Sequence, residues 1–203
     1  IILQLGEWVL REACRTAASW PAPMTLAVNV SPIQFQIPNL PEIVSRALID
    51  SGLAAGRLEL EITENVLLHN RESTLKTLHA LKAIGVGIVM DDFGTGYSSL
   101  SNLRCFPFDK IKIDRSFISG VTDDEAARSI VRAIVGLGRS LNLPVVAEGV
   151  ETVEQHRMVL EEGCPQAQGF LFGCPGEGPV YAAPSALVRV GFCHSPQLLI
   201  HKD

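Results

Sequence analysis

The sequence predicts an α/β fold with parallel strands, and two observations carry this prediction. Short β-rich runs alternate with longer segments of helical periodicity along most of the 203 residues. Each predicted strand also places a polar side chain at or near its C-terminal end, as the strands of a (β/α)8 barrel do. About six of the eight strand–helix units of such a barrel are recognisable. We therefore expect a TIM-like (β/α)8 barrel that is incomplete in this chain.

The individual elements follow from their periodicity and from signals at their ends. The predicted strands are residues 26–30, 58–63, 86–90, 110–113, 145–147 and 167–171. The predicted helices are residues 6–19, 41–51, 73–84, 123–141 and 152–161. Pro41 suits a first helical turn, Gly52 and Gly85 suit left-handed caps, and Thr152 can cap the last helix.

The chain divides into one long domain and a short tail. Strands and helices alternate up to about residue 175, where Pro175-Gly176-Glu177-Gly178-Pro179 breaks the pattern. Residues 1–175 are therefore predicted to form one domain, and residues 176–203 an irregular C-terminal segment. The sequence starts without Met and within a helical pattern, so we expect a domain truncated at its N-terminus, with two barrel units preceding Ile1.

The composition is typical of a soluble globular domain, with 47% hydrophobic and 19% charged residues. The net charge of −5 and the pI near 5.5 argue against DNA binding by bulk electrostatics. No run reaches the roughly 18 apolar residues of a membrane span. The five cysteines are scattered and form no C-x-x-C pair, which favours a reduced, cytoplasmic protein.

The polar residues at the predicted strand ends form one set. In chain order they are Asn29, Glu61, Asp91, Asp92, Lys112, Asp114, Glu148 and Gln168. A barrel brings such strand ends together at one mouth, whereas a doubly wound sheet gathers its ligands at a switch point. Any one carboxylate alone is more often a helix cap or a solvated loop residue. As a series, these residues predict a functional site at the mouth of a barrel.

The chemistry of this set predicts a site for divalent metal ions. Carboxylate and amide oxygens without clustered Cys or His favour Mg²⁺ or Mn²⁺ over zinc or copper. The adjacent Asp91 and Asp92 would repel one another unless cations lie between them. Two ions about 3.5–4 Å apart would relieve this repulsion and would activate water for attack on phosphorus.

Several neighbouring residues allow two interpretations. Lys112 lies in an apolar strand, where it would be costly without a carboxylate or phosphate partner. Lys110 has the same side-chain parity, but we interpret it as a solvated residue at the start of the strand. Glu59 shares the parity of Glu61, which we prefer as the ligand because it is nearer the strand end. Gln168 belongs either to the site or to the core, as a buried amide that the backbone satisfies.

Several motifs together resemble a known family. The most specific is the decapeptide from Asp91 to Leu100, DDFGTGYSSL. The others are Asn29-Val30-Ser31, Glu61-Ile62-Thr63-Glu64, Lys112-Ile113-Asp114, Ala147-Glu148-Gly149-Val150-Glu151-Thr152 and Gln168-Gly169-Phe170. In this order, over about residues 5–173, they resemble the EAL-domain phosphodiesterases of bacterial cyclic di-GMP signalling, which regulates biofilm formation and motility.

The resemblance implies a TIM-like barrel that hydrolyses cyclic di-GMP to the linear dinucleotide pGpG with Mg²⁺ or Mn²⁺. The metal ligands that it implies are Asn29, Glu61 and Asp91 for one ion, and Asp91, Asp92 and Glu148 for the other. Lys112 would hold the attacking water. Glu148 is also implied as a general base, a role that competes with metal binding.

The resemblance assigns further residues around the ligands. Glu64 would brace the loop after the aspartates, which couples the metal site to a dimer interface. The loop residues are Phe93, Gly94, Thr95, Gly96, Tyr97, Ser98 and Ser99. Asp114, Glu151 and Gln168 would contact the substrate or the ligands. The expected partners are cyclic di-GMP, a second copy in a homodimer, and an upstream sensor or GGDEF-type domain, with any membrane anchor in upstream segments.

The Glu-Ala-Leu motif that names the family does not occur in these residues, and we expect it upstream of Ile1. Three alternatives to an active phosphodiesterase remain. One is that these residues alone form a pseudo-enzyme or do not fold, since the loss of two barrel strands exposes two sheet edges and much apolar surface. A catalytically inactive receptor would bind cyclic di-GMP and pass the signal to a partner. An enolase-type barrel would use Lys110 and Lys112 as a Lys-x-Lys base. In such enzymes the metal carboxylates follow the lysines, whereas Glu61 and Asp91 precede them here.

Overall fold

The structure, a computed structural model, describes residues 2–68, 71–96, 103, 105–173 and 189–192. Among these residues, seven parallel strands form one sheet in the order β6-β5-β4-β3-β2-β1-β7. The strands are β1 (Thr25–Asn29), β2 (Leu58–Thr63), β3 (Gly87–Phe93), β4 (Lys110–Ile113), β5 (Val145–Ala147), β6 (Gln166–Ala167) and β7 (Arg189–Phe192). From β1 to β6, each strand pairs with the next along the chain, as in a barrel. The predicted α/β fold class is confirmed, with β1 to β6 as a half-barrel.

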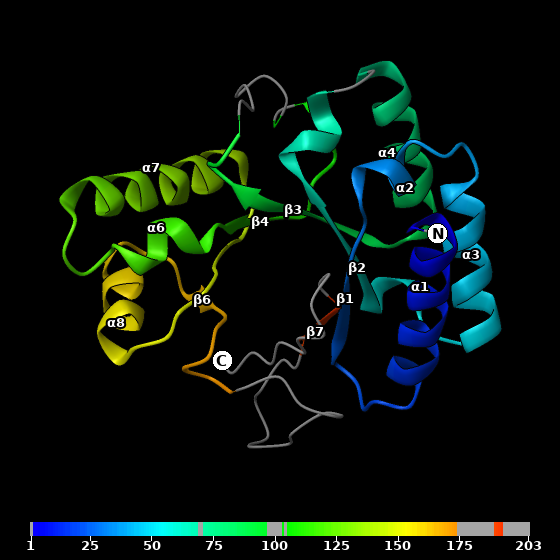
Figure 1. The fold of residues 1–203 in the computed structure, drawn as a ribbon, viewed down its shortest axis with the longest axis horizontal. Helices are drawn as coiled ribbons and strands as arrows, with labels where there is room; N and C mark the ends of the chain where they lie inside the picture. Colours follow the sequence, from blue (N-terminus) through cyan, green and yellow to red (C-terminus); the bar gives the residue numbers. More distant parts are fainter. Residues whose placement is uncertain (1, 69–70, 97–102, 104, 174–188, 193–203) are drawn as a thin grey trace.

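The helices alternate with these strands. They are α1 (Ile2–Ala18), α2 (Pro32–Phe35), α3 (Leu40–Ser51), α4 (Arg71–Ile84), α6 (Arg115–Ser119), α7 (Glu125–Leu141) and α8 (Val153–Glu161). Two short 3-10 helices, η1 (Ala55–Arg57) and η2 (Glu64–Leu68), flank β2. In Figure 1, α1, α3 and α4 lie together at the right, α6, α7 and α8 lie at the left, and the strands run between the two groups.

The strand boundaries agree with the prediction where the strands are buried. Residues 58–63, 110–113 and 145–147 coincide with β2, β4 and β5. Strand β3 continues three residues beyond its predicted end, through both aspartates to Phe93. The predicted strand at 167–171 is wrong, because β6 ends at Ala167. There the backbone of Gly169 lies so close to Val150 that a side chain would collide with it, and the chain turns.

The local signals at the helix ends are also visible. Thr152 and Gln155 form a capping box at the start of α8, in which each side chain bonds the other's backbone N–H at 3.1 Å. Gly52 ends α3 in the left-handed conformation, with φ of +72°. The short helices α2 and α6 were not predicted, although each begins at a capping residue, Ser31 and Asp114.

The alternation of side chains along each strand separates the core from the site. On β2, Leu58, Leu60 and Ile62 are buried among the apolar side chains that form the core. The residues between them, Glu59 and Glu61, point to the other face of the sheet. On β4 the same alternation buries Ile111 and Ile113 in the core and presents Lys110 and Lys112 on the face of the glutamates. Burial of each such aliphatic side chain contributes about 1.5–3 kcal/mol.

Strand β7 lies within residues 176–203, the predicted irregular C-terminal segment. Arg189–Phe192 pairs in parallel with β1, from Thr25↔Arg189 to Val28↔Phe192. These four residues are a strand where irregular structure was predicted. An unpaired strand edge presents free N–H and C=O groups and can bind any extended segment, whatever its side-chain pattern. The division of the chain at residue 175 stays a prediction.

No helix in the described part of the chain is both long and apolar enough to cross a membrane. Three cysteines lie in the described residues, and all three are free thiols. Cys14 and Cys164 are buried, whereas Cys105 is exposed. Burial raises the pKa of the Cys14 thiol and of the Cys164 thiol to about 11.

We predict that the buried thiols resist alkylation at pH 8. The thiolate is the reactive form, and with a pKa near 11 only about 0.1% of each buried thiol is ionised at that pH. Iodoacetamide should label Cys105 in the folded protein and reach Cys14 and Cys164 only after denaturation in urea, as peptide mass mapping would show. Labelling of Cys14 as fast as Cys105 would contradict the packing of α1.

Candidate metal centre

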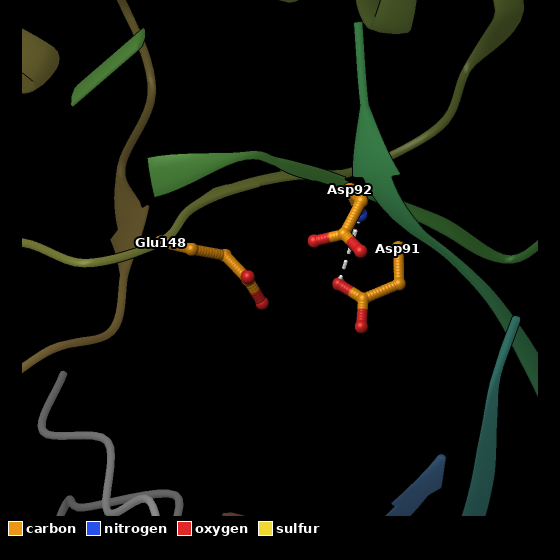
Figure 2. Close-up of side chains that lie close together, drawn as sticks. All are labelled: Asp91, Asp92 and Glu148. Atoms are coloured by element: carbon orange, nitrogen blue, oxygen red, sulfur yellow. Dashed lines mark hydrogen bonds between the residues drawn. The ribbon is translucent and has the colours of Figure 1, made fainter. Parts of the chain in front are cut away.

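The two adjacent aspartates lie at a bulge in β3. The register between β3 and β4 shifts there, so that Asp91 and Asp92 together oppose one residue, Lys112. In a regular strand, consecutive side chains point to opposite faces. The bulge and the left-handed backbone of Asp92, with φ of +53°, remove this alternation. Both carboxylates therefore point towards the same space (Figure 2).

Glu148 brings a third carboxylate to this space. It follows β5, and its backbone N–H donates to the carbonyl oxygen of Ile113 (3.1 Å) at the end of β4. One oxygen each from Asp91, Asp92 and Glu148 lie within 4.8 Å of one another. Figure 2 shows the side chain of Glu148 pointing from its own strand end towards the two aspartates. Three carboxylate oxygens at this spacing are a suitable donor set for a hard divalent cation.

Lys112 lies among the carboxylates and is almost fully buried, with 3% of its side chain exposed. Its Nζ is 2.9 Å from Glu61 Oε1 and 3.2 Å from Asp91 Oδ1, and it also contacts Glu148 Oε1. The predicted need of this buried ammonium for a carboxylate partner is thus met three times. Lys112 connects β2, β3 and the end of β5 through one charged group.

The charges around Lys112 do not balance. Glu61, Asp91, Asp92 and Glu148 are four carboxylates against one ammonium, an excess of three negative charges when all are ionised. Burial raises the pKa of Glu148 well above its usual range, and the repulsion from Asp91 and Glu61 adds to this shift against the attraction of Lys112. The pKa of Glu61 is raised for the same reasons. Divalent cations would supply the missing positive charge, so the residues fit such ions.

Asp92 and Asp114 have unequal environments. Burial, followed by the charges of Asp91 and Asp114, raises the pKa of Asp92 to about 6. Asp114 caps α6, and its carboxylate accepts a hydrogen bond from the Ser116 backbone N–H (2.9 Å). Although burial opposes the shift, the hydrogen bonds from Ser116 lower the pKa of Asp114. In this pair it is therefore Asp92 that takes up a proton first, and a cation would compete for the same oxygen.

Glu64 connects the loop after the bulge to η2. It is buried, and its Oε1 accepts a hydrogen bond from the Gly94 backbone N–H (2.8 Å). A side chain at Gly96 would collide with the carboxylate of Glu64, and one at Gly94, where φ is +100°, would collide with the ring of Phe117. The predicted contact of Glu64 with the loop is present, whereas the loop residues Tyr97, Ser98 and Ser99 lie outside the described residues.

The other predicted residues divide into two groups. Asn29 ends β1 and pairs in register with Glu61, which places it beside the cluster. Gln168 is buried, and its Nε2 donates to Glu148 Oε1 (2.7 Å), so it joins the site rather than only the core. Glu151 is exposed, and its backbone N–H donates to Gln155 Oε1 (2.7 Å). The structure does not bring the Glu151 side chain into the carboxylate cluster.

The interpretation of Lys110 as a solvated residue is wrong. Only 6% of Lys110 is exposed, and its Nζ donates to both carboxylate oxygens of Glu59, at 2.9 and 3.0 Å. The sequence does contain a signal for this pair. Glu-x-Glu on β2 and Lys-x-Lys on β4 repeat with the same period of two, so a strand pairing that joins Glu61 to Lys112 also allows Glu59 to reach Lys110.

We predict that replacement of Lys112 with Met destabilises the metal-free protein by about 3–5 kcal/mol, because it leaves buried carboxylates without their ammonium. Added Mn²⁺ should restore more stability to this variant than to the wild type, since the cations then neutralise the same carboxylates. Chemical denaturation with and without Mn²⁺ measures both effects. Lys76→Met, which removes an exposed ion pair with Glu72, should change the stability little. A Lys112→Met variant as stable as the wild type without metal would contradict the role of Lys112.

Comparison with known proteins places this site in a family. Residues 1–175 match the EAL domain family. An uncharacterized signaling protein of Caulobacter vibrioides is 55% identical over 175 residues, which are 86% of this chain and 22% of the relative. The bifunctional diguanylate cyclase/cyclic di-GMP phosphodiesterase MucR of Pseudomonas aeruginosa is 46% identical over 179 residues, 86% of this chain and 26% of the relative. The chain thus spans about a quarter of the length of these relatives.

Solved structures agree with this assignment. The PaMucR phosphodiesterase in complex with c-di-GMP superimposes with a TM-score of 0.81 and 46% sequence identity, over 84% of this chain and 70% of that chain. A manganese/cyclic di-GMP complex of Klebsiella pneumoniae BlrP1 gives a TM-score of 0.78 and 31% identity, over 84% of this chain and 44% of that one. Similarity in sequence and in fold thus agrees with the motifs at the strand ends, and the chain belongs to the EAL-domain family.

Proposed function

We propose that this domain hydrolyses cyclic di-GMP to linear pGpG and that it requires Mg²⁺ or Mn²⁺. The observation that carries the proposal is the cluster of four carboxylates around the ammonium of Lys112, at the strand ends of an EAL-family barrel. Related domains support the substrate, because PaMucR and BlrP1 have been solved with the cyclic dinucleotide. The BlrP1 complex also contains manganese.

Two divalent ions are part of the proposal. Asn29, Glu61 and Asp91 would hold one ion, and Asp91, Asp92 and Glu148 would hold the other. The described oxygens of the second group already lie within 4.8 Å of one another. Four positive charges would more than offset the excess of three negative charges and would leave the site able to attract a phosphodiester anion. When bound, such ions stabilise the negative charge that develops on the phosphoryl group.

The protein groups orient the reaction around these ions. Hydrolysis adds a water oxygen to one phosphorus atom of the ring and breaks the bond from that phosphorus to a ribose 3′ oxygen. One proton of the water is lost, and the leaving 3′ oxygen gains a proton. The ammonium of Lys112 is positioned by three carboxylates and would hold the attacking water through an N–H group that one of them releases when the ions bind that carboxylate. Gln168 holds the carboxylate of Glu148 in place through its 2.7 Å hydrogen bond.

The proposal also includes a homodimer partner, further domains of the full-length protein and the cellular location. The contact of Glu64 with the Gly94 backbone supports coupling between the bulge and the loop that would face a second copy in a homodimer. The relatives are roughly three to four times as long as this chain, and the name of MucR includes a cyclase, which supports an additional sensor or GGDEF-type domain. Because cyclic di-GMP would be the substrate, the domain would act in the bacterial cytoplasm.

The test of this function uses the full-length protein with cyclic di-GMP. We expect pGpG to accumulate in the presence of Mg²⁺ or Mn²⁺, followed by chromatography, and to stop when a chelator removes the ions. Addition of Mn²⁺ in excess of the chelator should restore the activity. Tight binding of cyclic di-GMP without pGpG, even with Mn²⁺, would instead identify the protein as a receptor.

We predict that Glu148→Gln weakens Mn²⁺ binding about tenfold or more and reduces hydrolysis by about three orders of magnitude. The physical reason is that the variant loses a charged oxygen from the group formed with Asp91 and Asp92, while Gln168 and Lys112 remain in place. Isothermal titration with Mn²⁺ and the rate of pGpG formation measure the two effects. Unchanged Mn²⁺ affinity with lost hydrolysis would assign Glu148 as a general base instead of a ligand. Glu154→Gln, at an exposed residue in the first turn of α8, is the matched control.

A further inference from the structure

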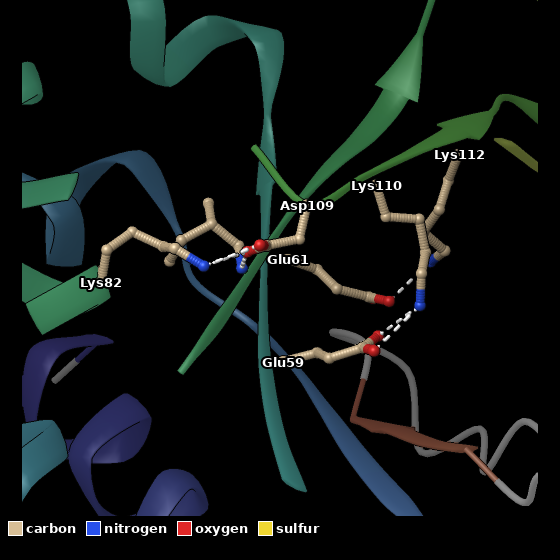
Figure 3. A network of polar contacts seen from close by, with 7 residues as sticks. Glu59, Glu61, Lys82, Asp109, Lys110 and Lys112 are labelled. Carbon is tan, nitrogen blue, oxygen red and sulfur yellow. Dashed lines mark hydrogen bonds and ion pairs between the residues drawn. The ribbon is translucent and has the colours of Figure 1, made fainter. Parts of the chain in front are cut away.

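A second buried ion pair lies beside the proposed metal site. Lys110 Nζ is 2.9 Å and 3.0 Å from the two oxygens of Glu59, and the side chains are 8% and 14% exposed. Figure 3 shows Glu59 and Glu61 extending from the same strand, each towards a lysine of β4. The two strands thus carry two equivalent pairs, Glu59 with Lys110 and Glu61 with Lys112. The proposed function uses only the second pair.

The register of the sheet makes both pairs diagonal. Glu61 pairs with Val89 on β3, and Val89 pairs with Lys110 on β4, so Glu61 and Lys110 lie at the same level of the sheet. Glu59 lies one step lower, opposite Gly87. Each glutamate therefore reaches across β3 to the lysine that lies one step higher. Glu61 and Lys110 are about 10 Å apart at their backbones, a distance that the two extended side chains can span.

Gly87 allows the lower diagonal to form. A Cβ atom at this position would lie 3.2 Å from Cγ of Glu59, which is tighter than ordinary contact. Without a side chain there, Glu59 can lie over β3 on its way to Lys110. At the next level the register places Val89 between Glu61 and Lys110, so these two side chains would have to meet beside or over Val89.

We propose that Glu59 is a positioning residue that holds the Lys110 ammonium away from Glu61, and this inference rests on the proposed role of Glu61 as a metal ligand. Without the carboxylate of Glu59, the buried ammonium of Lys110 loses two hydrogen bonds. The carboxylate of Glu61, at its own level of the sheet, then becomes its partner, because a buried charge binds an opposite charge within reach. Glu61 would be drawn away from Lys112 and from the metal ion, and metal affinity would fall.

The experiment compares single and double variants of the full-length protein by isothermal titration with Mn²⁺. Glu59→Gln should weaken Mn²⁺ binding by about tenfold. Glu59→Gln combined with Lys110→Met should bind Mn²⁺ within about twofold of the wild type, because the competing ammonium is gone. Glu72→Gln, which neutralises a glutamate paired with a lysine on the exposed face of α4, controls for the change in net charge.

The double variant separates positioning from stability. If the pair only stabilised the fold, Glu59→Gln would lower the thermal midpoint without Mn²⁺ and leave the Mn²⁺ affinity of the folded protein unchanged, which would overturn the proposal. A double variant that binds Mn²⁺ as weakly as Glu59→Gln would overturn it too. If Glu59→Gln does not fold, the same Mn²⁺ titration is made with Glu59→Asp, whose shorter side chain keeps the charge but lies farther from Lys110. Unchanged Mn²⁺ affinity in this variant would also overturn the proposal. Absence of Mn²⁺ binding by the wild type would instead refute the metal site itself.

Discussion

The ammonium of Lys112 is the constraint on which the rest of the site depends. It lies on a strand whose neighbouring residues, Ile111 and Ile113, are completely buried, so its charge is enclosed by protein. An isolated ammonium in such a place is strongly unfavourable, and it is stable here because β2, β3 and the end of β5 each bring a carboxylate to it. The same carboxylates outnumber it, and the remaining negative charge is offset either by protons, which the raised pKa values of Glu61 and Glu148 favour, or by bound cations. The strand arrangement therefore suits the binding of divalent cations.

The bulge at Asp91 and Asp92 shows how local backbone geometry supports this arrangement. A regular β3 would turn one of the two carboxylates to the opposite face of the sheet, towards the core. The left-handed conformation of Asp92 is unusual for a residue with a side chain, although aspartate tolerates it better than most. Several contacts hold the turn in place, including the hydrogen bond of Thr95 Oγ1 to the Asp92 carbonyl oxygen (2.9 Å) and that of the Gly94 N–H to Glu64. Strain at Asp92 is thus offset by its surroundings.

The sequence predicted what repeats with a regular period and missed what departs from it. Strands β2, β4 and β5 were placed correctly because buried apolar residues bound them, and the polar residues of the cluster were predicted because they lie at or near the ends of the strands. A bulge has no periodic signature, so the extension of β3 through Asp92 could not be predicted. Strand β6 was misplaced because the close approach of Gly169 to Val150 is a tertiary contact. The pair of Glu59 and Lys110 was missed because it depends on the register of β2 against β4, which are separated by β3.

The two glutamates of β2 and the two lysines of β4 can pair across β3 in two ways. In a level arrangement Lys110 would pair with Glu61, and Glu59 would lose its ammonium while remaining buried. In the diagonal arrangement both glutamates of β2 have a lysine, and Lys112 still reaches Asp91 and Glu148. The diagonal leaves less buried charge uncompensated, and Gly87 gives Glu59 the space to adopt it. An apolar pair in place of Glu59 and Lys110 would be about as stable, but it would not favour the diagonal alignment over the level one. The ion pair of Glu59 and Lys110 therefore leaves Lys112 as the partner of Glu61, and this defines the position of the Glu61 carboxylate.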